Sequence, residues 1–137
     1  MSVFVDSSVW YAAADSGDRS NGRAKALLTM GEPLVTSDHV LLETWLLLRS
    51  RLGRSSAEAF WDGIRSGAAR LEATTTADLE AAWAIGVAFA DQDFSLADRT
   101  SFAVMERLGL TRVATFDNDF AVVRLGPRRD RAFTVQT

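Results

Sequence analysis

The sequence contains no cysteine, and this absence excludes disulfide bonds, thiolate metal sites and a cysteine nucleophile. Signals for export and membrane insertion are also missing. The N-terminus lacks a basic start and meets an acid at Asp6, unlike a signal peptide. The longest apolar run, residues 81–90, is about half the length that a bilayer requires. We therefore expect a cytoplasmic protein that does not enter a membrane.

Motifs for several common chemistries are absent as well. Neither GxxxxGK[ST] nor GxGxxG occurs, so a nucleotide-binding cradle is unsupported. The single histidine, His39, could be combined on paper with Ser7 and Asp6 into a catalytic triad. No Gly-x-Ser-x-Gly turn supports that arrangement.

The chain has no excess of positive charge, since its net charge is −3. A protein that binds nucleic acid through a broad basic surface is normally cationic. Either nucleic acid is not the partner, or the negative charge is concentrated at one functional spot. Lys25 is the only lysine and the other basic residues are arginines, which make bidentate contacts to phosphate or to carboxylate and so do not distinguish RNA from an acidic partner.

The 137 residues suit a single domain, residues 1–137, because one core of this size buries about two thirds of the unfolded chain's surface. The pattern of short apolar runs and capped amphipathic segments predicts alternating strands and helices. We expect strands at 2–5, 34–36, 71–73, 113–116 and 133–135, and helices at 7–14, 20–30, 38–52, 55–67, 75–90 and 95–108. This order predicts an α/β fold, with a parallel sheet of four or five strands and helices on both faces. Sites in such folds form beyond the carboxyl ends of the strands.

Two acids directly follow predicted strands. Asp6 ends the first strand, and Asp117 follows the strand VATF, with Asp119 two residues further on. Asp6 could instead cap the helix that follows it. The sequence Asp-Asn-Asp at 117–119 could instead form a simple turn.

Two further acids lie on core-facing helix positions. Glu43 has mainly apolar neighbours in VLLETWLLL, although it could reach water at the edge of that stripe. Asp98 shares a helix face with Phe102 and Met105, although it could simply complete a capping box begun by Ser95.

All four acids could converge at one edge of a parallel sheet. Carboxylates a few ångströms apart repel one another unless a cation neutralises them. Oxygen ligands suit Mg²⁺ or Mn²⁺, and such a metal can activate water and stabilise charge on a phosphate. The pattern therefore indicates phosphodiester hydrolysis.

The sequence resembles the PIN-domain ribonucleases, and specifically the VapC-type toxins of bacterial type II toxin–antitoxin systems. The resemblance spans nearly the whole chain and rests on four pieces in this order: VFVDSSVW, HVLLETWLLL, FSLADRTSFAVMERLG and VATFDNDF. It implies that Asp6 and Asp98 are the principal magnesium ligands and that Glu43 and Asp117 complete the catalytic pocket.

The resemblance implies further properties of the site and of the protein. Ser7 and Ser8 would hydrogen-bond within the pocket, and Asp119 stands near a position where many family members carry histidine. The expected function is a Mg²⁺-dependent endoribonuclease that is inhibited by a cognate antitoxin and forms a homodimer.

Two other functions remain open from the sequence. The first is a metal-dependent phosphoryl-transfer domain of another kind. A haloacid-dehalogenase pattern would need an acid where Ser8 stands, and a receiver domain would need a lysine much later than Lys25. The second is a PIN-like module that binds its partner without catalysis.

Overall fold

A five-stranded sheet forms the centre of the computed structural model, which describes residues 1–137. Every pair of neighbouring strands is parallel, and the order is β3-β2-β1-β4-β5. The strands are β1 (Val3–Val5), β2 (Leu34–Ser37), β3 (Arg70–Glu72), β4 (Arg112–Ala114) and β5 (Thr134–Gln136). The helices are α1 (Ser7–Ala14), α2 (Asn21–Leu28), α3 (Asp38–Leu52), α4 (Arg54–Arg65), α5 (Thr76–Ala88), α6 (Leu96–Leu108) and α7 (Asp119–Val122).

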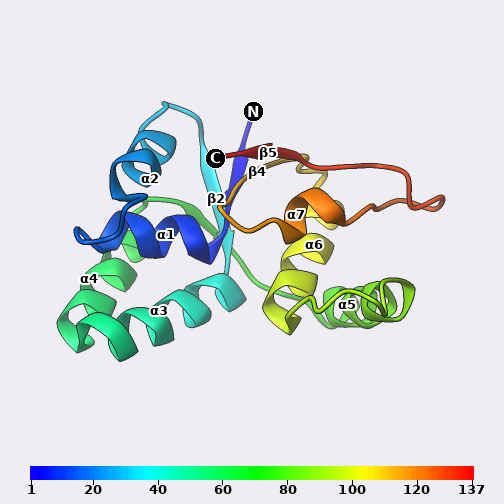
Figure 1. The fold of residues 1–137 in the computed structure, drawn as a ribbon, viewed down its shortest axis with the longest axis horizontal. Coiled ribbons are helices and arrows are strands. Elements are labelled where there is room, and N and C mark those ends of the chain that lie inside the picture. The colour runs from blue at the N-terminus through cyan, green and yellow to red at the C-terminus, as the bar shows by residue number, and fades with distance from the viewer.

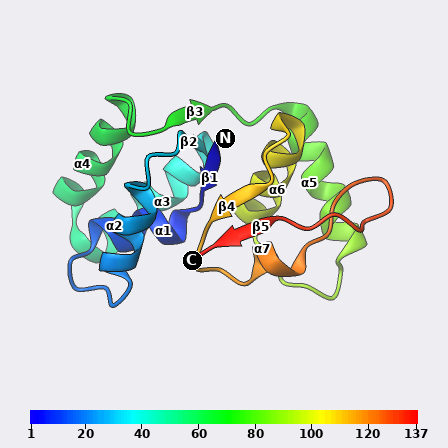
Figure 2. The same ribbon diagram turned by 90° about the horizontal axis from the view of Figure 1, so that it is seen from above.

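The helices form two layers, one on each side of the sheet. Helices α1 to α4 gather on one side of the strands and α5 to α7 on the other, in both views (Figures 1 and 2). The predicted parallel α/β architecture with helices on both faces is confirmed. No helix in the structure combines the length and the apolar character needed to cross a membrane.

Strand β1 occupies the middle of the sheet because all three of its side chains are apolar and buried. Phe4 pairs with Val35 of β2 on one side and with Val113 of β4 on the other. The chain first builds the sheet from β1 outward through β2 and β3, and then returns to add β4 against the free edge of β1. The direction of winding thus reverses between β1 and β4, and such reversal points are where parallel sheets open a crevice for ligands.

Helices α5 and α6 are held together at their ends by polar contacts. The hydroxyl of Thr75 caps α5 in the predicted reciprocal capping box with Asp78. The carboxylate of Asp78 also accepts hydrogen bonds from the guanidinium of Arg107 on α6, with an Nε–Oδ1 distance of 3.0 Å. Gly109 ends α6 in the left-handed conformation that glycine adopts without strain.

The predicted element bounds differ from the observed ones by no more than two residues, with one element missed. The expected strand 113–116 ends at Ala114, because the chain turns away from the sheet at the Asp117 loop. Helix α7 was not predicted. Its single turn follows directly from this loop and is too short to show a helical periodicity.

Candidate active site

Asp6 and Asp117 lie side by side in the fold because they follow adjacent strands, β1 and β4. The side chain of Asp6 is buried, and its Oδ2 accepts hydrogen bonds from the hydroxyls of Ser8 (3.0 Å) and Thr115 (2.9 Å). Asp6 makes no side-chain capping bond to α1, although it stands at the N-cap position. Its carboxylate is therefore held jointly by Thr115, directly after β4, and by the side chain of Ser8 in the first turn of α1.

Thr115 is a site residue that the sequence analysis missed. Its buried hydroxyl donates to Asp6 and accepts from the backbone amide of Asp117 at 2.9 Å. The hydroxyl of Ser8 accepts from the amide of Phe116 in the same way. The only sequence signal for Thr115 is a polar residue at the end of an apolar strand, two positions before an acid.

Glu43 reaches the same region from the middle of α3. Its side chain is half-buried, and its Oε1 accepts a hydrogen bond of 2.5 Å from the hydroxyl of Ser7. The Ser7 hydroxyl also lies 3.4 Å from Oδ1 of Asp6. Ser7 thus connects two of the predicted carboxylates, as expected of a residue that supports the pocket.

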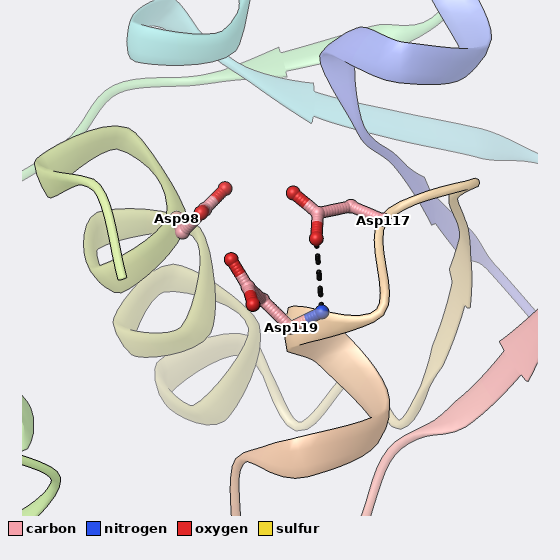
Figure 3. Close-up of side chains that lie close together, drawn as sticks. All are labelled: Asp98, Asp117 and Asp119. Carbon is pink, nitrogen blue, oxygen red and sulfur yellow. Dashed lines mark hydrogen bonds between the residues drawn. The ribbon is translucent and has the colours of Figure 1, made fainter. Parts of the chain in front are cut away.

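Asp98 enters the site from the first turn of α6. The Ser95 hydroxyl accepts from the amide of Asp98 at 3.0 Å, and that contact is the helix cap. The Asp98 carboxylate accepts no hydrogen bond from the backbone amide of Ser95, so the expected reciprocal capping box is incomplete. The carboxylate is buried and points across the pocket toward Asp117 and Asp119 (Figure 3).

Asp98, Asp117 and Asp119 form a close group of acids. One carboxylate oxygen from each lies within 4.8 Å of the other two. Oδ1 of Asp117 also accepts from the amide of Asp119 at 2.9 Å, so the turn expected at Asp-Asn-Asp does form (Figure 3). The turn also places Asp119 within the group, at the position near which many family members carry histidine.

Asp6 and Glu43 lie beside this group of three rather than within it. Both are close enough to Asp117 for its charge to raise their pKa values. The five acids therefore form one pocket, with three acids at its α6–α7 side and two at its α1–α3 side.

The pocket disfavours its own negative charge. Burial is the main cause that raises the pKa of Asp98 to about 7, and the charges of Asp117 and Asp6 add to it. Burial also raises the pKa values of Asp6, Glu43 and Asp119 above their ordinary values. Acids with raised pKa values in a cleft are typical of functional sites, and a bound cation would remove the repulsion.

The donor set suits a hard divalent cation. All of the converging side chains offer carboxylate oxygens, which Mg²⁺, Mn²⁺ and Ca²⁺ prefer to the nitrogen and sulfur ligands of softer metals. The one histidine nearby, His39, has its Nδ1 3.1 Å from the Thr100 hydroxyl. The chemistry of these ligands therefore fits a divalent metal ion.

Comparison with known proteins also indicates an enzyme that acts on phosphodiester bonds. The sequence model of the PIN domain matches residues 3–125. The chain is 43% identical over 121 residues to VapC20 of Mycobacterium tuberculosis, described as a 23S rRNA-specific endonuclease. That match covers 87% of this chain and 92% of VapC20.

Solved structures share the fold. The crystal structure of Mycobacterium tuberculosis VapC20, described as a Sarcin-Ricin loop cleaving toxin, has a TM-score of 0.82 and 39% identity, covering 88% of this chain and 93% of that one. VapBC2 from Rickettsia felis, solved with a promoter DNA fragment, has a TM-score of 0.70 at 11% identity, covering 99% and 98% of the two chains. The likeness to VapBC2 concerns the fold alone. On the family match and the identity to VapC20, the chain belongs to the PIN-domain family, among its VapC-type nucleases.

Proposed function

We propose that this protein is a Mg²⁺-dependent endoribonuclease and the toxin of a toxin–antitoxin pair. The observation that carries the proposal is the convergence of five carboxylates where β1 and β4 end, in a chain that is 43% identical to an RNA endonuclease. Each of the four sequence pieces of the VapC resemblance contributes an acid to this pocket: Asp6, Glu43, Asp98 and Asp117.

The residues of the pocket divide into ligands and supports. Asp6, Asp98, Glu43 and Asp117 would hold Mg²⁺, for which Mn²⁺ could substitute, and Asp119 adds a fifth oxygen donor group. A bound Mg²⁺ would supply an activated water and stabilise the charge that develops on the phosphate. Thr115 and Ser8 orient Asp6 through their hydroxyls, and Ser7 orients Glu43. Such outer contacts hold ligand carboxylates in position and support metal affinity.

We extend the proposal to the substrate. VapC20 is described as acting on 23S rRNA and as cleaving the Sarcin-Ricin loop. We propose that the same RNA class is the substrate here, because the two chains align over most of their lengths. An RNA loop also presents unpaired bases and an accessible backbone, which proteins recognise more readily than a paired helix.

The assembly is proposed as a homodimer in the cytoplasm, inhibited by a cognate antitoxin. The outer face of α5 carries apolar side chains spaced four residues apart, and these are exposed: Leu79 (42%), Trp83 (71%) and Val87 (65%). A contiguous exposed apolar stripe is typical of a protein interface. Residues 1–137 would form one PIN domain, since β5 lies beyond the matched segment yet completes the sheet.

The test uses partner-free protein incubated with ribosomes and with purified 23S rRNA. Three conditions are compared: Mg²⁺, excess EDTA, and the Asp98→Asn variant in Mg²⁺. We expect discrete cleavage that requires both the metal and Asp98. The control is Asp91→Asn, which removes an exposed acid before α6 and should cleave normally.

Two results would overturn the proposal. Cleavage that persists in EDTA, or in Asp98→Asn, would show that the acidic pocket is not the catalytic centre. Absence of divalent-metal binding by calorimetry would instead favour a PIN-like module that binds without catalysis.

A further inference from the structure

A second groove adjoins the acidic pocket on the side of α1. It has a volume of about 420 Å³, and its walls include Ser7, Ser8, Tyr11, Phe116, Arg19 and Arg51. We call it the Arg19–Arg51 groove. Two of these residues, Ser7 and Ser8, also donate hydrogen bonds to the carboxylates of Glu43 and Asp6. The groove and the acidic pocket therefore share these two serines.

Arg51 lines this groove from α3. Glu43, Leu47 and Arg51 are four residues apart on one face of α3, so Arg51 lies about 12 Å along the helix axis from Glu43. The guanidinium of Arg51 lies over the ring of Tyr11, 5.1 Å from its centroid. The Tyr11 hydroxyl in turn donates to Asp15 at 2.8 Å, which restrains the ring. Arg51 makes no ion pair, so a restrained and exposed cation faces the groove.

Arg19 supplies a second cation from the segment before α2. It is exposed and has no ion-pair partner in the structure. The neighbouring acid, Asp18, also lines the groove, and its Oδ1 accepts a hydrogen bond from the amide of Ser20 at 2.7 Å. Asp18 thus serves the local turn, and neither arginine is bound to a carboxylate of the protein.

We propose that the Arg19–Arg51 groove binds the RNA strand beside the bond that is cut, with the two arginines contacting its phosphates. The proposal rests on the proposed ribonuclease function. A strand entering an acidic pocket needs positive charge next to that pocket, because its own phosphates are repelled by the carboxylates. Arginine suits this role, since its planar guanidinium binds phosphate in a bidentate manner.

The aromatic walls favour RNA over an acidic peptide as the occupant. Tyr11 and Phe116 line the groove beside the arginines, and both are only half-buried. Grooves that hold single-stranded nucleic acid combine cations along the backbone with aromatic rings for the bases. An acidic peptide would use the arginines but would have no particular need of the aromatic rings.

The experiment measures RNA binding in the cleavage-deficient Asp98→Asn background. The probe is a fluorescent single-stranded RNA of mixed sequence, titrated at several salt concentrations. The variants are Arg51→Gln, Arg19→Gln, the double variant and Arg51→Lys. The matched control is Arg49→Gln, which removes the same charge from an exposed position on α3 outside the groove.

We expect log affinity to fall less steeply with log salt, so that each groove substitution makes this negative slope shallower by about 0.7 and the double substitution makes it shallower by about 1.4. Arg51→Lys should keep the slope, because the charge remains, and Arg49→Gln should leave it unchanged. Equal slopes in all variants, or an equal loss in Arg49→Gln, would overturn the proposal. Loss of binding to an acidic peptide, with RNA binding intact, would overturn it in favour of a protein occupant.

A parallel cleavage assay separates the two proposals. If the wild-type chain cleaves RNA while the groove variants bind RNA normally, only the groove assignment fails. If the wild-type chain neither binds nor cleaves RNA, the proposed function fails with it.

Discussion

At the residue scale, Thr115 determines how well the acidic pocket is organised. Its hydroxyl donates a hydrogen bond to the carboxylate of Asp6 and accepts one from the backbone amide of Asp117. We predict that Thr115→Val, which keeps the shape and removes the hydroxyl, weakens Mn²⁺ binding about 10- to 100-fold. Calorimetric titration measures this change. The control is Thr111→Val at an exposed position, and an equal loss there would show that the effect is not specific to the pocket.

Asp98 makes the metal-free protein sensitive to pH. Its pKa is raised to about 7 from an unfolded value near 3.8. In the folded state it therefore keeps its proton at pH values where the unfolded chain has lost it, so the stability that this proton supports is lost as pH rises through 7. We predict that in EDTA the protein melts at a lower temperature at pH 8 than at pH 5.

The Asp98→Asn variant tests the predicted direction of this pH dependence. The amide cannot ionise, so the variant should lose part of the pH dependence and melt higher than the wild type at pH 8 in EDTA. Thermal unfolding followed by circular dichroism gives both curves. A variant less stable than the wild type at pH 8 would contradict the assignment. In the wild type, metal binding must also displace this proton, so metal affinity should weaken as pH falls below 7.

At the element scale, the ion pair between Asp78 and Arg107 joins α5 to α6. Asp78 is 2% exposed, and the side chain of Arg107 is 35% exposed. The Arg107 guanidinium and the capping bonds of Thr75 hold the pKa of Asp78 below its ordinary value. The pair matters for the site because α6 carries Asp98.

We predict that Arg107→Ala lowers the free energy of unfolding by about 3 kcal/mol, since it leaves a buried carboxylate without its cation. This loss of unfolding free energy should lie at the lower end of the range for broken buried ion pairs, because Asp78 still accepts the hydrogen bond from the backbone amide of Thr75. Urea denaturation measures it. Arg65→Ala breaks an exposed pair with Asp62 and should cost less than about 1 kcal/mol. Similar losses in the two variants would refute a special role for the buried pair.

The elements that could be predicted from sequence are those with strong local signals. The apolar runs at β1 and β2 and the capped starts of α5 and α6 identify these segments, because burial and capping depend on nearby residues. Helix α7 has no such signal, since one turn cannot show periodicity. It forms because the Asp117 turn starts it and Phe120 packs into the core.

The sequence indicated four acids of the site and their convergence, but it indicated neither Thr115 nor the place of Asp119 beside Asp98. Asp6, Glu43, Asp98 and Asp117 stand out because acids are unusual at strand ends and on apolar helix faces. Thr115 was missed because a single threonine in a strand is ordinary. The closeness of Asp119 to Asp98 depends on how α7 packs against α6, which is a tertiary contact. Whether these residues bind the metal stays a prediction.

At the scale of the whole molecule, the charge distribution accounts for the net charge of −3. Five of the 18 acidic residues gather at the pocket, so the rest of the chain carries 13 acidic and 15 basic residues. The excess negative charge is therefore concentrated at the acidic pocket. A protein with a net charge of −3 can still bind RNA when its negative charge is confined in this way.

This concentration predicts a strong effect of divalent cations on stability. A ligand that binds only the folded state at 100 times its dissociation constant adds about 2.7 kcal/mol. We expect Mg²⁺ to raise the melting temperature at pH 8, and NaCl of equal ionic strength to have much less effect. Differential scanning calorimetry measures both. An equal shift from the two salts would indicate general screening rather than a site.

The hydroxyls of Ser8 and Thr115 also decide which oxygen of Asp6 is free. Each hydroxyl accepts a backbone amide from the loop after β4, and each has a single hydrogen left to give. Both hydroxyls lie within hydrogen-bond distance of Oδ2 of Asp6 and 3.3 Å from each other, while the Ser7 hydroxyl lies 3.4 Å from Oδ1. The two oxygens of one carboxylate are thus unequal before anything binds: the lone pairs of Oδ2 are occupied by the protein, and those of Oδ1 are left for a proton or a cation. Because the amides belong to the backbone, this polarity follows from the pairing of β1 with β4 and does not depend on the side chains at positions 116 and 117.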